Sequence, residues 1–278
     1  MILVIGATGT IGSEVVGRLL AADERPRAFV RDPDKARQLL GEQVEPVVGD
    51  LDQPETIEAA LGGVDRLFLL TTQSSRQPDW ERTVIAAAAG AGVAHVVKLS
   101  VFRAEERSPL RFARQHREAE RVLEQSGLGW TMVRPVFLMQ NLRAMVRDGA
   151  IYTAAGDGRV AMIDARDIAA VAAAALTTSG HEGKTYTLTG PEALSFDDVA
   201  SKLSQQSGEQ IRHARVSVDD VRSALESAGV AAWFADDMAR LHAMLAAGYE
   251  DLVTDDVRAV TGSPPRTLTQ FVRDTDGT

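Results

Sequence analysis

The 278-residue sequence contains no cysteine, which excludes disulfide bridges, thiolate metal ligands and thiol nucleophiles. Its formal net charge of −9 argues against direct binding to nucleic acid or to an anionic membrane. No apolar run reaches transmembrane length, and the N-terminal residues lack the basic region of a signal peptide. The five histidines show no metal-ligand spacing. We therefore expect a cytoplasmic protein that acts on a small molecule without a bound metal. A homodimer would match the commonest oligomeric state.

The first twelve residues combine a short apolar run with three regularly spaced glycines. The residues before the first glycine are typical of a parallel strand buried on both faces, and a helical apolar pattern follows the last glycine. Gly6 would permit the strand-to-helix turn, Gly9 would let the backbone approach a pyrophosphate, and Gly12 would allow close helix packing. Thr8 and Thr10 add hydroxyl donors. The pattern predicts a dinucleotide site with the phosphates at the helix N-terminus.

The residues after the second predicted strand bear on which dinucleotide binds. This strand covers Arg27–Val30 and is followed by Arg31 and Asp32, with Lys35 one turn later. A guanidinium at this place suits the 2′-phosphate of NADP(H), because it can bond a phosphate through two N–H groups and is always charged. Asp32 leaves an alternative open, since NAD-binding folds use an acidic residue here to bond the ribose 2′-hydroxyl. We expect a preference for NADP(H).

Strands and helices continue to alternate along the first half of the chain. Further strands are predicted at residues 45–48, 66–70, 95–99 and 130–133, and helices at 54–61, 80–91 and 110–125. Six strands with intervening helices describe an α/β fold with a doubly wound parallel Rossmann sheet. Ligands of such sheets bind at the carboxyl ends of the strands.

The alternation loosens after about residue 138. We expect a Rossmann domain over residues 1–138 and a smaller, mainly helical lobe over 139–278, of which 164–176 would pack back on the sheet. Residues 149–160 are predicted to form a loop or hairpin. Ser195 and Ser217 precede acidic residues and are predicted helix N-caps. Asp164 and Asp167 lie where a helix begins, so capping is a more typical role for them than catalysis.

Several segments together resemble one known family. They include "GATGTIG", "RDPDKA", "VVGDLDQPETIEAAL", "HREAE", "SGLGWTMVRPVFLMQN" and "YTLTGPEALSFDDVASKLS". The sequence resembles the NmrA-like group of atypical short-chain dehydrogenases/reductases from its first residue to Asp274. The last two segments are the more specific ones and are similar to bacterial NAD(P)H-dependent quinone oxidoreductases. The resemblance implies an extended Rossmann fold, NADP(H) as cofactor, and a cleft between the sheet and the C-terminal lobe.

The resemblance also implies a set of ligand-contacting residues. The cofactor set is Gly6, Thr8, Gly9, Thr10, Ile11 and Gly12 on the pyrophosphate, Arg31 and Lys35 on the 2′-phosphate, Asp50 and Leu51 at the adenine, and Thr71, Thr72, Gln73, Pro135 and Phe137 at the nicotinamide half. Phe137, Met139 and Asn141 are candidates for substrate contact, although Phe137 and Met139 could equally pack the sheet against the C-terminal lobe.

The sequence departs from ordinary short-chain dehydrogenases at the catalytic pair. Those enzymes use Tyr-x-x-x-Lys, in which the lysine lowers the pKa of the tyrosine so that its phenol can protonate an alkoxide. None of the three tyrosines here is followed by lysine at that spacing. His116 and Glu120 stand in place of the tyrosine and the lysine, one helical turn apart.

Three residues are candidates for catalysis in the absence of that pair. His116 could donate a proton if Glu120 raises its pKa, or the two could be a solvated pair on a charged helix. Ser100, at the end of a strand, could bond a substrate oxygen, and Lys98, two residues earlier on the same strand, could hold charge near the cleft.

Two functions of different kinds fit the sequence. The first is an NADPH-dependent oxidoreductase that transfers hydride to a quinone or a related conjugated or aromatic ketone. A quinone can take its proton from water, so the absence of Tyr-x-x-x-Lys is compatible with this chemistry. The second is an NADP(H)-binding redox sensor of the NmrA type that performs no chemistry and regulates a partner. A nucleotide-sugar epimerase is a weaker alternative, because that chemistry needs the missing pair.

Overall fold

The computed structural model describes residues 1–275 of the chain, which fall into two compact units. Unit 1 comprises residues 1–107, 113–134 and 168–186. Unit 2 comprises residues 108–112, 135–167 and the described residues from 187 onward. Unit 1 therefore contains both the glycine-rich N-terminal segment and a stretch from the second half of the chain.

The sheet of unit 1 confirms the predicted Rossmann class and adds a seventh strand. Its order is β10-β6-β5-β4-β1-β2-β3. The strands are β1 (Ile2–Ile5), β2 (Arg27–Val30), β3 (Glu45–Val48), β4 (Arg66–Leu69), β5 (His95–Leu99), β6 (Gly129–Pro135) and β10 (Lys184–Leu188). β1 pairs in parallel with β2 on one side and with β4 on the other. The strand order thus reverses at β1, and ligands of such sheets bind at this switch point, outside the carboxyl ends of the strands.

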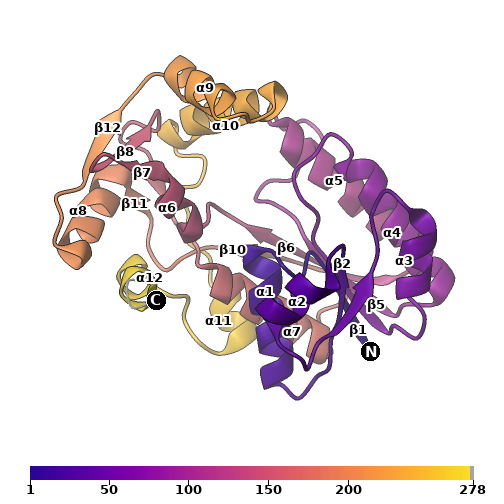
Figure 1. Cartoon of the computed structure of the whole chain (residues 1–278). Coiled ribbons are helices and arrows are strands. Elements are labelled where there is room, and N and C mark those ends of the chain that lie inside the picture. The colour runs from indigo at the N-terminus through magenta and orange to yellow at the C-terminus, as the bar shows by residue number, and fades with distance from the viewer. Residues whose placement is uncertain (276–278) are drawn as a thin grey trace. The chain divides into compact units, whose positions relative to one another are not determined.

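Helices cover both faces of this sheet, as Figure 1 shows, with α3, α4 and α5 on one face and α1 and α7 on the other. The helices are α1 (Thr10–Ala21), α2 (Pro33–Leu40), α3 (Pro54–Ala60), α4 (Gln77–Ala91), α5 (Arg111–Glu124) and α7 (Ala165–Thr177). α4 begins three residues before the predicted Trp80, because a proline occupies its first turn, where its fixed φ suits a helix and its missing N–H is not needed.

The core between the sheet and helices α3, α4 and α5 follows from alternation along the strands. Leu67 and Leu69 of β4 and Val96 of β5 face this side and pack against Ile57 of α3 and Ile85 of α4. Each is at most 1% exposed. Burial of one such side chain stabilises the fold by about 1.5–3 kcal/mol. The same alternation sends the side chain of Lys98, two residues after Val96, into this layer.

Unit 2 contains helices and two small sheets. The helical segments are η1 (Met139–Asn141, a 3₁₀ turn), α6 (Leu142–Met145), α8 (Phe196–Ser207), α9 (Val218–Ser227), α10 (Ala232–Ala246), α11 (Asp256–Thr261) and α12 (Leu268–Thr275). One sheet has the order β12-β8-β7, and the other pairs β11 with β9. These strands are β7 (Val146–Arg147), β8 (Ala150–Thr153), β9 (Arg159–Val160), β11 (Leu194–Ser195) and β12 (Arg212–Arg215). Within residues 1–275, no helix has the length and apolar character needed to cross a membrane.

Local signals in unit 2 are confirmed where a side chain makes a specific bond. Ser195 caps α8: its Oγ accepts the Asp198 N–H at 3.1 Å, and the Asp198 carboxylate accepts the Ser195 N–H at 3.0 Å. Ser217 and Asp220 form the same reciprocal pair at the start of α9. Residues 149–160, predicted to form a loop or hairpin, instead contain β8 and β9, which belong to different sheets; β8 pairs with the preceding β7 in an antiparallel hairpin. β12 was not predicted, because three of its four residues are polar and it lacks the alternation of a half-buried strand.

Candidate functional site

The predicted cofactor residues of unit 1 share one edge of its sheet. β1, β2, β3, β4 and β5 run parallel, so their carboxyl ends meet at the same edge. Residues 6–12 follow β1, residues 31–35 follow β2, residues 50–51 come shortly after β3, and residues 71–73 come shortly after β4. Four segments that lie far apart in the sequence are therefore gathered where a dinucleotide binds such a sheet.

The loop after β1 needs glycine at two of its three positions. Gly6 has a φ of +80°, which side chains rarely adopt, and an added Cβ would lie 2.6 Å from the carbonyl oxygen of Leu70. A Cβ on Gly12 would lie 2.0 Å from the carbonyl oxygen of Gly6, so helix α1 packs directly against the turn. Thr8, Gly9 and Thr10 are exposed at the start of α1, where unpaired N–H groups and the helix dipole favour an anion.

The residues after β2 are the ones that bear on the cofactor ribose. Arg31 is exposed directly after the strand, and Lys35 is exposed in the first turn of α2. The Asp32 carboxylate is the N-cap of α2: its Oδ1 accepts the N–H groups of Asp34 at 3.1 Å and Lys35 at 3.0 Å. Capping is therefore a sufficient structural reason for this acid, and it does not require contact with a ribose.

A small polar cluster surrounds the predicted adenine segment after β3. Asp52 accepts a hydrogen bond from Trp80 Nε1 at 2.5 Å and pairs with the Arg76 guanidinium at 2.6 Å. Asp50 Oδ1 accepts the Asp52 N–H at 3.0 Å, so the turn that holds Asp50 and Leu51 is tied to α4. Arg76 and Trp80 were not among the predicted site residues, and only their place at the start of the helix after β4 could have suggested them.

A buried polar cluster lies beneath the ends of β4 and β5, between the sheet and helices α4 and α5. We call Thr71, Gln77, Glu81, Lys98 and His116 the buried cluster; each is at most 6% exposed. Lys98 Nζ lies 2.8 Å from Glu81 Oε2 and 3.2 Å from His116 Nδ1. Thr71 donates to Glu81 Oε1 at 2.8 Å. Buried charges are tolerated when they are paired and hydrogen-bonded in this way.

The structure corrects the prediction for His116. Glu120 does not contact it; the partners of the ring are Lys98, Gln73 and Gln77. Burial and the neighbouring Lys98 charge lower the pKa of His116 well below 6.5, so the ring is neutral at physiological pH rather than a charged donor. The solvated-surface alternative is wrong as well, because His116 is 4% and Glu120 0% exposed.

Glu120 instead organises a second buried pair with Ser100. The Ser100 hydroxyl is 1% exposed and donates to Glu120 Oε1 at 2.7 Å. Arg134 bonds both Glu120 oxygens, at 2.8 and 2.5 Å. Burial alone would raise the pKa of Glu120, but the bonds from Arg134 and Ser100 outweigh it and lower that pKa. Ser100 and Lys98, which is 0% exposed, are therefore both buried and bonded within unit 1, and their catalytic roles stay predictions.

The segment from Pro135 to Asn141 belongs to unit 2. Its backbone is held at Phe137, whose N–H donates to the buried carboxylate of Glu250 at 3.0 Å. The Phe137 ring is half-buried and meets Phe196 edge to face at 6.3 Å. Met139 is 2% exposed, which favours the packing alternative for this residue, whereas Asn141 is exposed. Burial raises the pKa of Glu250 to about 7.

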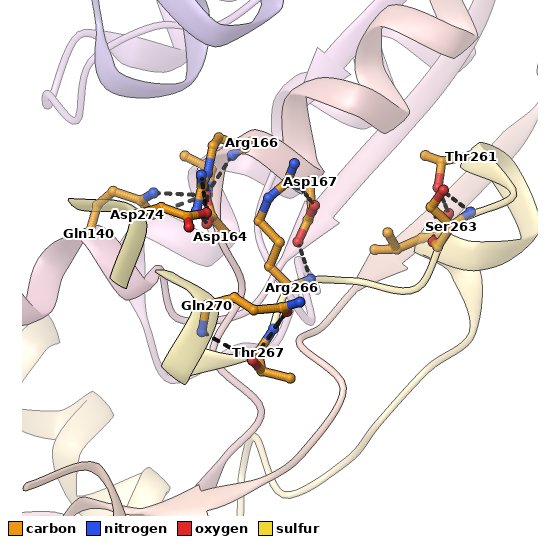
Figure 2. Close-up of polar contacts among 12 residues, drawn as sticks. Gln140, Asp164, Arg166, Asp167, Thr261, Ser263, Arg266, Thr267, Gln270 and Asp274 are labelled. Carbon is orange, nitrogen blue, oxygen red and sulfur yellow. Dashed lines mark hydrogen bonds and ion pairs between the residues drawn. The ribbon is translucent and has the colours of Figure 1, made fainter. Parts of the chain in front are cut away.

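Two charge pairs at the start of α7 fasten the C-terminal segment of unit 2 (Figure 2). Asp164 caps α7 by accepting the Arg166 N–H at 2.9 Å, which confirms its predicted role. The Arg166 guanidinium joins Asp164 at 2.6 Å to Asp274 at 2.8 Å. Asp167 accepts the N–H of Arg266 at 2.7 Å and pairs with its guanidinium. These acids are thus paired, and in the described part of the chain no three metal-ligating side chains come close enough to hold an ion.

Comparison with known proteins agrees with this arrangement. A family model described as NAD(P)H-binding matches residues 6–179. The NAD(P)H azoreductase of Xenophilus azovorans is 43% identical over 278 residues, covering 98% of this chain and 97% of that protein. Quinone oxidoreductase 2 of Escherichia coli is 33% identical, covering 98% and 97%.

Solved structures show the same likeness over the whole chain. The Escherichia coli NADPH-dependent quinone oxidoreductase complexed with NADPH matches with a TM-score of 0.89 at 31% identity, covering 99% of this chain and 100% of that one. The Citrobacter triphenylmethane reductase complexed with NADP(H) matches with a TM-score of 0.87 at 31% identity, covering 99% of each chain. The glycine-rich loop, the Rossmann sheet and these relatives lead to one conclusion: the chain belongs to the NAD(P)H-binding, NmrA-like family of atypical short-chain dehydrogenases/reductases.

Proposed function

We propose that the protein is an NADPH-dependent reductase that transfers hydride to a quinone or a related conjugated or aromatic ketone. As a member of its family the chain is an NAD(P)H-dependent oxidoreductase, so the proposal concerns the preferred cofactor and the acceptor. The observation that carries it is the burial of the three candidate catalytic side chains: Lys98, Ser100 and His116 are each at most 4% exposed.

That burial limits the acceptors that suit the site. A ketone that takes hydride at its carbonyl carbon, whether aromatic or not, becomes an alkoxide and needs a positioned proton donor, so quinones and conjugated ketones suit this site best. His116 is neutral, and the Ser100 hydrogen is committed to Glu120. A quinone takes two electrons as hydride and spreads the resulting negative charge over its ring and oxygens, after which water supplies the proton. The balanced reaction is quinone, NADPH and one proton giving hydroquinone and NADP⁺, and it needs no buried acid.

The relatives act on acceptors that are likewise conjugated. Their names specify azo compounds, quinones and triphenylmethane dyes. These differ in size and shape, yet each offers an electron-poor centre joined to aromatic or unsaturated groups. This common chemistry supports a conjugated acceptor for the present protein, and a panel of such compounds will identify which one it prefers.

The preference for NADPH rests on Arg31 and Asp32. Arg31 is exposed immediately after β2, with Lys35 nearby in the sequence, and the two cations suit a 2′-phosphate. Asp32 is bound to the N-terminus of α2 as its cap. Leu51, Thr72, Pro135 and Phe137 remain predicted contacts of the cofactor.

The test is oxidation of NADPH and of NADH by the purified protein with a panel of quinones, azo dyes and aromatic ketones. We expect turnover with quinones and faster turnover with NADPH. Arg31→Ala should raise the KM for NADPH about 10- to 100-fold, the worth of a charge-assisted hydrogen bond, and leave NADH nearly unchanged. Arg25→Ala is the control, because Arg25 is exposed near the opposite end of the same strand. Tight NADPH binding without turnover on any acceptor would refute the proposal and favour a redox sensor.

A further inference from the structure

The buried cluster contains a lysine whose hydrogen-bond partners can be counted. An ammonium group has three N–H donors and no acceptor. Lys98 Nζ lies 2.8 Å from Glu81 Oε2, 3.0 Å from the carbonyl oxygen of Leu99 and 3.2 Å from His116 Nδ1. Glu81 Oε2 forms an ion pair with the ammonium outside hydrogen-bond geometry, and the Leu99 oxygen accepts a hydrogen bond. Because the ammonium has no acceptor, its contact with His116 also requires an N–H of Lys98. Nδ1 of His116 must therefore accept, and a neutral ring then carries its proton on Nε2.

The Nε2–H of His116 in turn needs an acceptor. The side-chain amides of Gln73 and Gln77 lie 3.2 and 3.3 Å from Nε2, each through its nitrogen. Two N–H groups cannot bond each other, so one amide must present its oxygen instead, which a half-turn of the amide allows. Gln77 Oε1 is buried and has no hydrogen-bond partner among the described residues. Turning this amide would nevertheless put its oxygen where its nitrogen now lies, 3.4 Å from the carboxylate oxygen Oε1 of Glu81, and two acceptors repel each other there. Gln73 is therefore the amide that turns its oxygen to His116.

This arrangement leaves the Gln73 –NH₂ group pointing away from the buried cluster. Gln73 is exposed, unlike His116, and lies shortly beyond the carboxyl end of β4. The neighbouring loop is the glycine-rich one, because Gly6 lies against the carbonyl oxygen of Leu70. A donor at this place faces the edge of the sheet where the cofactor of such folds binds.

We propose that His116 is a positioning residue: held by the Glu81–Lys98 pair, its neutral ring fixes Gln73 so that the Gln73 –NH₂ donates to a carbonyl oxygen of the ligand. That oxygen belongs either to the carboxamide of the nicotinamide or to the acceptor. The inference rests on the proposed function for the identity of the ligand, but not for the state of His116. Neither Glu81 nor Lys98 reaches the surface, so their part in this proposal is to hold His116 in place.

The first test reads the state of His116 without any substrate. Nitrogen-15 NMR of the full-length protein, with the His116 signals assigned by their loss in His116→Gln, reports which ring nitrogen carries hydrogen. We expect the Nε2–H tautomer throughout pH 6–8. A ring protonated on Nδ1, or doubly protonated at pH 7, would overturn the proposal. This result is independent of whether any acceptor is turned over.

The second test measures function in a double-mutant cycle of Gln73→Met and His116→Gln. Loss of one hydrogen bond predicts about a tenfold effect for Gln73→Met. A higher Kd for NADPH, measured by fluorescence, assigns the bond to the nicotinamide carboxamide. An unchanged Kd with lower kcat/KM for the acceptor assigns it to the acceptor. In either case the constant that Gln73→Met changes should be the same in the double variant as in Gln73→Met alone, because both substitutions break the same chain of hydrogen bonds.

His95→Gln is the matched control for the cycle. His95 is also buried, at 3% exposure, and bonds Thr131 at 2.9 Å, but it starts β5 at the opposite edge of the sheet. It should lower stability without changing the Kd for NADPH or the kinetics. Multiplicative effects of Gln73→Met and His116→Gln, or no effect of Gln73→Met on any of these constants, would overturn the proposal. If no acceptor is reduced at all, the proposed function fails, while the Kd and the tautomer still decide this inference.

Discussion

Replacing Glu250 by glutamine should change how the stability of the protein depends on pH. Glu250 is 5% exposed, and burial raises its pKa from 4.5 to about 7. The folded state therefore binds this proton more tightly than the unfolded state. Stability from this group is fully present below pH 4.5 and is lost as the pH rises through about 7. At about 1.4 kcal/mol per pKa unit, the loss amounts to about 3 kcal/mol.

Glutamine keeps the hydrogen bond and removes the charge. Its amide oxygen can accept the Phe137 N–H, which now bonds Glu250 Oε2 at 3.0 Å. The free energy of unfolding of Glu250→Gln, relative to the native sequence, should therefore rise by about 3 kcal/mol between pH 4 and pH 8.5.

The assay is urea unfolding of the native sequence and of Glu250→Gln at a series of pH values, with the slope m checked for constancy. Glu226→Gln serves as the control, because this exposed glutamate of unit 2 places no charge in the interior. A difference between Glu250→Gln and the native sequence that does not vary with pH would refute the reasoning, since the carboxyl would then titrate alike in both states.

Three further predictions concern other buried or constrained groups. Burial lowers the pKa of His242, whose Nδ1 accepts the Ala154 N–H, to about 4. The contribution of His242 to the stability of the fold is therefore present above pH 6.5 and is lost as the pH falls through 4. In urea unfolding, the free energy of unfolding of His242→Asn relative to the native sequence should rise by about 3 kcal/mol between pH 8 and pH 3.5. Gly12→Ala should abolish NADPH binding in a fluorescence titration and lower the Tm, because the Cβ of the alanine would lie 2.0 Å from the Gly6 carbonyl oxygen. NADPH binding as tight as that of the native protein would contradict this packing. Asp32→Ala should cost about 1 kcal/mol of stability through loss of the cap while keeping the ratio of NADPH to NADH turnover; a fall in NADH turnover alone would show that Asp32 reads the ribose.

The sequence predicted the elements of the sheet because buried parallel strands and the glycine loop have strong local signals. Ile2–Ile5 is continuously apolar, Gly6 has a positive φ, and Gly12 is required by its contact with Gly6 in the same glycine-rich segment. Strand β12 escaped prediction because its residues are polar and it is held by pairing with β8, 62 positions earlier at Arg212↔Ala150. Pairing of that kind leaves no periodic trace in the strand itself.

The candidate site also has a part that the sequence predicts and a part that it does not. Its cofactor loops follow strands and could be placed from the sequence, whereas the partner of His116 could not. Helical spacing suggested Glu120, one turn away, but the ring turns toward Lys98 on the sheet and Gln77 on α4. Glu81 is one of three charged residues on α4, and its distance of 2.8 Å from Lys98 shows that it is a buried counter-ion. Side-chain direction across packed elements is set by tertiary contacts that spacing along one helix does not encode.

The charge pairs at the start of α7 have a consequence for the order in which the protein is made. Asp167 is 3% exposed, and its partner Arg266 comes 99 positions later, while Arg166 bonds Asp274 across 108 positions. At about 5–20 residues per second, a ribosome needs roughly 5–20 s to make the intervening chain. Throughout that time the nascent chain holds a carboxylate whose burial is unfavourable without its counter-ion. Unit 2 should therefore complete its folding only after Arg266 and Asp274 have been made, so this part of the fold closes late during synthesis.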